Sequence, residues 1–130
     1  MVVRIALVGA LAGSALAKAI TLVEGRGVSV LGVSGIAGWA VTAGLGVAEC
    51  VGVALLIAGK IRLGASWVFA LGTGFGAVTV SLIGLGYPLA VCGCFGRYSV
   101  PVSGHLAMVF GILLGSRFLM LSEWKSGGEV

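Results

Sequence analysis

Hydrophobic residues fall into four long stretches along the chain, and short polar segments separate them. The stretches cover about residues 2–23, 36–59, 65–91 and 104–121. A helix needs ~20 residues to cross a hydrocarbon core of ~30 Å, and helices satisfy backbone polar groups where there is no water. The pattern therefore predicts an all-α protein, an integral membrane four-helix bundle that forms a single transmembrane domain over residues 1–130.

The first stretch has a second interpretation. Arg4, an apolar core and then Ala15-Leu16-Ala17 also fit a signal peptide with its cleavage site. We interpret the segment as a retained first helix.

The composition supports lipid as the main solvent of the chain. It is 59% hydrophobic and 9% charged, whereas soluble domains carry roughly 25% charged residues. The formal net charge is +4, but the basic residues are scattered singly at the ends of the apolar stretches. This distribution is typical of topology determinants and not of a nucleic-acid-binding surface.

The basic residues are distributed unevenly between the two sides of the expected bundle. Four spans put both termini and the second polar segment on one side, and positive charge concentrates on the cytoplasmic side of membrane proteins. We therefore expect a multi-pass cell-membrane protein with cytoplasmic termini and an extracytoplasmic third segment. The side with the termini carries Arg4, Lys60, Arg62, Arg117 and Lys125. The other side carries Lys18, Arg26 and Arg97.

The most specific local element is Cys92-Gly93-Cys94-Phe95-Gly96, which follows the third stretch. Two thiols one residue apart can close a small, strained disulfide ring, and a strained, accessible disulfide is more oxidising than a structural one. We favour a redox-active dithiol of Cys92 and Cys94 without a metal. A static disulfide and a metal site with His105 as third ligand are the alternatives, although structural zinc prefers four ligands.

Two charged side chains lie within the expected spans, Lys18 in the first and Glu49 in the second. A charge in mid-bilayer costs about 2.5–3.5 kcal/mol on insertion scales, so such residues usually face the bundle interior and pair. We expect a Lys18–Glu49 pair, with Lys18 reaching inward from nearer the membrane surface. The alternative is a Lys18 that extends outward and a protonated Glu49. The role of Glu49 is either to handle or orient a proton or to form structural hydrogen bonds.

Two further residues lie near the cysteine pair in sequence. Arg97 follows it and His105 begins the fourth stretch, and a neighbouring cation stabilises the thiolate, which is the reactive form of cysteine. An interfacial histidine without such a role is the alternative. Cys50 lies mid-way along the second stretch, too deep for a direct bond to the pair, and we expect it to be a packing residue.

Glycines recur at four-residue spacing within the stretches. Small residues at this spacing let helix backbones approach closely in a bilayer. A homodimer interface and close packing within one bundle both fit the spacing, and we favour packing within the bundle. The pairs are Gly9-x-x-x-Gly13, Gly72-x-x-x-Gly76 and Gly111-x-x-x-Gly115.

The order of these features resembles the MauE family, which is named for methylamine utilisation and is related to the DoxX-like membrane proteins. The resemblance rests on charged and cysteine positions in series: Arg4, Lys18, Glu49, Cys92-Gly93-Cys94-Phe95-Gly96 and Arg117. It implies a four-helix membrane bundle that takes part in thiol–disulfide chemistry of the cell envelope with thioredoxin-like partners. On this resemblance Cys92 and Cys94 are the redox pair, and Lys18 and Glu49 match intramembrane charged positions.

The leading hypothesis is a membrane thiol–disulfide oxidoreductase or relay component that exchanges disulfides with a thioredoxin-like or other disulfide-containing envelope protein. By analogy only, four-helix thiol oxidoreductases pass electrons to a quinone through a second cysteine pair. This chain has three cysteines and no second pair, which argues against an autonomous dithiol–quinone relay. Quinone remains an open alternative as cofactor. Two other classes are a non-enzymatic membrane subunit or maturation chaperone with a structural loop disulfide, and a small transporter or quinone-binding subunit that uses Glu49 and Lys18.

Overall fold

The computed structural model describes residues 1–25, 35–86 and 101–126, and these form four long helices without a strand. The helices are α1 (Val2–Val23), α2 (Gly35–Ile57), α3 (Ile61–Gly84) and α4 (Val102–Ser126). Each has a length and hydropathy sufficient to span a membrane. The expected all-α membrane bundle is therefore confirmed, and the chain is a multi-pass membrane protein.

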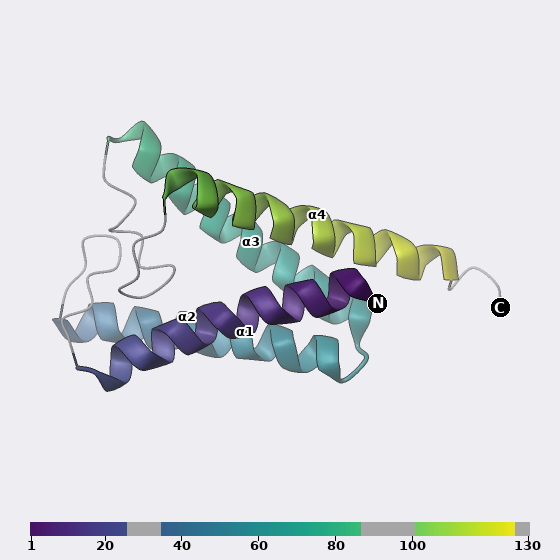
Figure 1. Ribbon diagram of the computed structural model, residues 1–130, viewed down its shortest axis with the longest axis horizontal. Helices are drawn as coiled ribbons and strands as arrows, with labels where there is room; N and C mark the ends of the chain where they lie inside the picture. Colours follow the sequence, from purple (N-terminus) through teal and green to yellow (C-terminus); the bar gives the residue numbers. More distant parts are fainter. Residues whose placement is uncertain (26–34, 87–100, 127–130) are drawn as a thin grey trace.

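The helices run alternately up and down, so the bundle has two distinct ends (Figure 1). We call the end where α1 and α3 begin and α2 and α4 finish the terminal end, because the first helix starts and the last helix stops there. The opposite end is the loop end, where residues 26–34 and 87–100 join the helices. The most extensive contacts are within the α1–α2 and α3–α4 pairs, and contacts of α2 with α3 and of α1 with α4 join the two pairs.

The ends of α3 and α4 differ from those expected from hydropathy. The third apolar stretch suggested residues 65–91, whereas α3 covers Ile61–Gly84, and α4 covers Val102–Ser126 instead of 104–121. Backbone geometry sets these limits: Lys60 has a non-helical conformation, and Gly86 has a φ of 73° that ends α3. Polar residues can continue a helix past the hydrocarbon core, because water rather than lipid surrounds them there.

Arg4 and a close glycine contact hold the terminal end together around the short connection between α2 and α3. Gly59 turns the chain with a φ of 77°, and Gly64 lies so close to Leu56 that an added β-carbon would sit 3.1 Å from the Leu56 backbone nitrogen. The Arg4 guanidinium donates a 2.9 Å hydrogen bond to the carbonyl of Ile57. This carbonyl belongs to the last turn of α2, where backbone acceptors lack intrahelical partners.

The interior changes character along the bundle. Buried residues of α1 recur at alternating spacings of four and three, as in a coiled-coil seam, and the stripe begins with leucines and continues with polar residues. The terminal half is an apolar core of Leu7, Leu11, Leu56, Ala65, Val68, Ile112 and Leu119. All the buried polar side chains of the described residues except Ser116 lie on the loop-end side of that core, namely Ser14, Lys18, Thr21, Thr42, Glu49, Thr79 and His105.

Glycine allows α3 and α4 to approach closely. An added β-carbon on Gly72 would lie 2.9 Å from Ile112 Cγ2, and one on Gly76 would lie 3.2 Å from Val109 Cγ1. The expectation of packing within the bundle is confirmed for this pair. It is also confirmed for Gly115, where such a carbon would lie 3.3 Å from Leu7 of α1. It is wrong for Gly111 and for Gly9 and Gly13 of α1, which have no neighbour within 4 Å of such a carbon. Gly9 and Gly13 are exposed, so the sequence-based homodimer alternative stays open for α1.

Replacing Gly72 with alanine tests the α3–α4 contact. We expect Gly72→Ala to destabilise the bundle by about 1–3 kcal/mol, because the new methyl group overlaps a β-branched side chain of α4. Gly74→Ala is the matched control, since no atom lies within 4 Å of its added β-carbon. The free energy of unfolding in mixed micelles is the measurement. Equal stability of the two variants would contradict the packing described here.

Candidate functional site

An ion pair and a hydroxyl form a closed triangle between α1 and α2. Lys18 Nζ lies 2.8 Å from Glu49 Oε1 and donates a second hydrogen bond, of 2.7 Å, to Ser14 Oγ. The Ser14 hydroxyl in turn donates to the same Glu49 oxygen at 2.9 Å. The expected Lys18–Glu49 contact is therefore present, and a single carboxylate oxygen receives both donors.

The whole cluster is withdrawn from the protein surface. Lys18 is 0% exposed and Glu49 1% exposed. The Lys18 ammonium also lies 5.7 Å from the centre of the Phe75 ring of α3, within the range of a cation–π contact. Groups from α1, α2 and α3 thus surround one cation. In a low-dielectric interior, such a pair needs further hydrogen bonds to offset its desolvation, and Ser14 supplies one of them.

The local sequence explains how the cluster forms. Ser14 and Lys18 are four residues apart and therefore share one face of α1. Gly46 of α2 lies opposite, where an added β-carbon would be 4.0 Å from Lys18 Cβ, so the lysine side chain has room between the helices. Trp67 of α3 donates from Nε1 to the carbonyl of Ala48 at 2.9 Å, which attaches α3 to α2 next to Glu49.

Sequence reasoning found the two charges and missed the neighbours that complete the cluster. The four-residue spacing of Ser14 and Lys18 was a usable signal, because it puts a hydroxyl beside the ammonium. Phe75 gave no signal, since nothing in the local sequence tells which aromatic residue of another helix faces a given cation.

Glu49 keeps one hydrogen-bond acceptor free of the cluster. Its Oε2 atom is buried and has no hydrogen-bond partner among the described residues. A buried carboxylate oxygen without a donor is costly. Chemically it is a place where a proton, or a donor from a bound molecule, would be stabilised.

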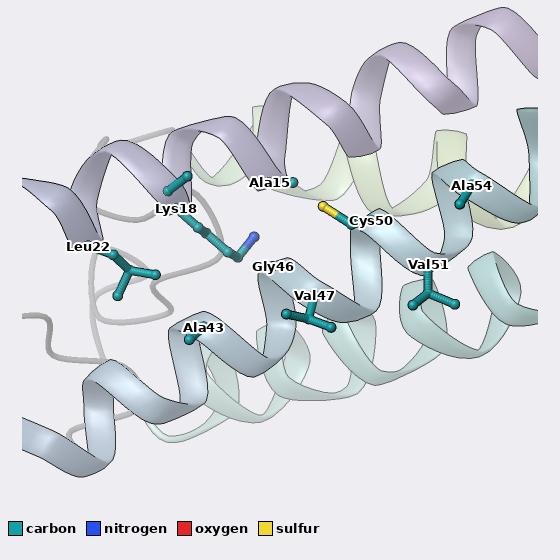
Figure 2. Close-up of a pocket in the computed structure, with 10 residues that line it drawn as sticks. Ala15, Lys18, Leu22, Ala43, Gly46, Val47, Cys50, Val51 and Ala54 are labelled. Carbon is teal, nitrogen blue, oxygen red and sulfur yellow. The ribbon is translucent and has the colours of Figure 1, made fainter.

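An open groove runs between α1 and α2, and Lys18 is the one member of the cluster that lines it (Figure 2). Its volume is about 470 Å³, and its walls are mainly alanine, glycine and valine. Lys18 extends from α1 toward α2 at one side of the groove, and the sulfur of Cys50 points toward Ala15 at the other. Cys50 is a free thiol and is exposed. The expectation that it is a packing residue is therefore wrong, because the small residues of α1 leave the groove open at its position.

Of the remaining sequence-predicted site residues, one lies in a described helix and three do not. His105 is buried in the first turn of α4, at the loop end, with 5% exposure. Cys92, Cys94 and Arg97 lie outside the described residues. The structure therefore brings Lys18 and Glu49 together with Ser14 and Phe75, and it puts His105 in the polar half of the interior.

The fold and the cluster define a class: a small multi-pass helical membrane protein with an ion pair in its interior. Comparisons with protein-family models, curated proteins and solved structures find no match. The resemblance to the MauE family stays a prediction from the residues quoted above.

Removing one charge tests the cluster. We expect Lys18→Met to destabilise the bundle by about 3–5 kcal/mol, because Glu49 would remain buried without its cation. The double variant Lys18→Met/Glu49→Met removes both charges at similar volume and should recover most of this loss. Lys60→Met removes an exposed lysine as the control. The measurement is the free energy of unfolding in mixed micelles, and a double variant as unstable as the single one would contradict a charge-dependent cluster.

Proposed function

We propose that the protein is a membrane thiol–disulfide oxidoreductase or relay component, and that Cys92 and Cys94 exchange disulfides with a thioredoxin-like or other envelope partner. The observation that carries the proposal is the position of the buried polar groups. All of them among the described residues except Ser116 lie on the loop-end side of the apolar core, and the segment with both cysteines follows α3 and precedes α4 at that end. Buried polar groups toward the end of the bundle at which the cysteine segment leaves α3 would suit coupled electron and proton transfer.

The exchange itself follows from thiol chemistry. A thiolate of one cysteine attacks a sulfur of the partner's disulfide, forms a mixed disulfide and releases the partner's other sulfur as a thiolate. The second cysteine then attacks the mixed disulfide, which closes the Cys92–Cys94 bond and releases the partner as a dithiol. Two electrons pass from this chain to the partner, and the reverse sequence carries them the other way.

In this proposal the charged residues support the cysteines and form no bond to sulfur. Arg97 and His105 flank the cysteine segment in sequence, and a cation near a thiol raises its thiolate fraction. The Lys18–Glu49 pair is electrically neutral as a unit, and Glu49 Oε2 supplies an interior acceptor for a proton. These four residues are positioning residues in the proposal.

The proposed orientation puts the termini in the cytoplasm and the cysteine segment outside. The terminal end carries Arg4, Lys60, Arg62 and Arg117, and Lys125 lies close to the end of α4. Lys18 on the other side is neutralised inside the bundle by Glu49, so it does not act as a loop charge. The remaining basic residues on that side are Arg26 and Arg97, and the positive-inside bias is stronger than the sequence alone indicated.

Cysteine substitution tests the relay. In a Cys50→Ala background, we expect Cys92 and Cys94 of membrane-embedded protein to cycle between dithiol and disulfide, as measured by mass-tag alkylation across a series of redox buffers. Cys92→Ser or Cys94→Ser should trap a mixed disulfide with a partner, because the resolving thiol is missing. Cys50→Ala alone is the control and should leave cycling unchanged. A pair that stays oxidised throughout would favour a non-enzymatic subunit with a structural disulfide.

Labelling of intact cells tests the orientation. A membrane-impermeant maleimide should modify reduced Cys94 in the Cys50→Ala/Cys92→Ser variant without cell lysis. A cysteine introduced at Ser122, near the terminal end, should react only after lysis. The opposite labelling pattern would show that the termini lie outside the cell and the cysteine segment in the cytoplasm.

A second candidate function is supported by the free carboxylate oxygen and the groove. A quinone headgroup could contact the interior beside Lys18 while its isoprenoid tail lies along the alanine-lined groove. A small transporter that uses the same pair belongs to this candidate. Mutation distinguishes the two functions. If the second candidate is correct, Glu49→Gln stops the activity of the protein, whereas Cys92→Ser and Cys94→Ser leave that activity intact.

A further inference from the structure

A second pocket lies at the terminal end of the bundle, away from the ion pair. It is formed between the start of α3 and the last part of α4 and has a volume of about 430 Å³. Its lining combines two arginines with apolar and aromatic side chains: Arg62, Ser66, Phe69, Arg117, Met120, Leu121 and Trp124. The pocket therefore offers concentrated positive charge beside a surface that suits hydrocarbon.

Within the described residues, neither guanidinium group of the pocket has a partner of opposite charge. Neither Arg62 nor Arg117 makes a salt bridge or a side-chain hydrogen bond with any residue that the structure describes. The guanidinium of Arg62 lies 5.8 Å from the centre of the Trp124 ring, which holds it at one side of the pocket. Each guanidinium carries five N–H donors in a planar fork that matches the oxygens of a phosphate.

Arg117 lies deeper in the membrane than the interface, so a bound anion would stabilise its charge. Trp124 is of the type that sits at the membrane–water interface, and it ends the apolar part of α4. Arg117 lies seven residues earlier, roughly 10 Å deeper at the rise of an α-helix. Arg117 is exposed on the outside of the bundle, where an arginine at this depth must extend toward the interface or neutralise its charge.

We propose that this pocket binds the phosphate of an anionic phospholipid, with Arg62 and Arg117 as its two ligands. The lipid phosphate lies between the guanidinium groups, and an acyl chain continues along Phe69, Met120 and Leu121. Ser66 is not counted as a ligand, because its hydroxyl donates to the backbone carbonyl of Arg62 at 2.9 Å. The site is independent of the proposed thiol chemistry.

The apolar part of the lining favours a lipid over a free anion. Inorganic phosphate could use the arginines but would leave the surface of Phe69, Met120 and Leu121 without a partner. A phospholipid satisfies both halves of the pocket at once. Basic pockets between transmembrane helices near a membrane surface are typical sites of acidic lipid headgroups.

Native mass spectrometry of the full chain in detergent tests the site. We expect phosphatidylglycerol to form a one-to-one complex at lower concentration than phosphatidylcholine of the same acyl chains. Arg62→Gln or Arg117→Gln should each weaken phosphatidylglycerol binding about tenfold, because each variant removes one charge-assisted, bidentate contact. Both variants should weaken phosphatidylcholine binding less, because its choline cation already balances the charge of its phosphate.

Lys60→Gln is the matched control, because Lys60 is exposed at the same end, two residues from Arg62, and does not line the pocket. It should leave the preference for phosphatidylglycerol intact. An equal loss in Lys60→Gln and Arg62→Gln would overturn the proposal in favour of general surface charge. Competition by millimolar inorganic phosphate as effective as that of the lipid would overturn it in favour of a free-anion site. Arg62 is exposed, so its substitution is compatible with folding even if Arg117→Gln is unstable.

Discussion

The contact between Lys18 and Glu49 limits how α1 and α2 can be arranged, because neither charge can turn toward lipid without a large loss of solvation. The 2.8 Å separation sets the rotation of each helix about its own axis and their relative height. Once these are set, Ser14 faces the same carboxylate, Gly46 faces the lysine stem, and the leucines of the same α1 stripe fall into the apolar core. Electrostatics thus selects the register, and packing of small and apolar residues stabilises it.

The sequence predicted the membrane class, the four spans and the ion pair, since each depends on a strong free-energy difference between lipid and water. It could not predict which face of each helix is buried, because lipid-facing and core-facing residues are equally apolar in such a bundle. Gly72 and Gly9 illustrate the limit: both belong to the same glycine spacing, yet one contacts α4 and the other is exposed. The Arg62–Arg117 pocket was hidden for the same reason, since its residues are far apart in sequence and meet only through the α3–α4 pairing.

The division of the interior gives the two ends of the bundle different properties. Leu7, Leu11 and Leu56 close the terminal half with apolar side chains, whereas the buried polar groups lie toward the loop end. A proton that reaches Glu49 therefore has polar neighbours on one side and hydrocarbon on the other. The arrangement fits chemistry coupled to one membrane surface better than conduction from one surface to the other.

The separation of Lys18 and Glu49 along the chain, 31 residues, also bears on how the protein is made. Lys18 precedes Glu49 by those 31 residues, so a first helix released alone into lipid would carry an uncompensated ammonium. Entry of α1 and α2 together as a hairpin avoids that state, because the carboxylate accompanies the cation. The buried pair thus favours biogenesis in two-helix units, with α3 and α4 following as the second hairpin.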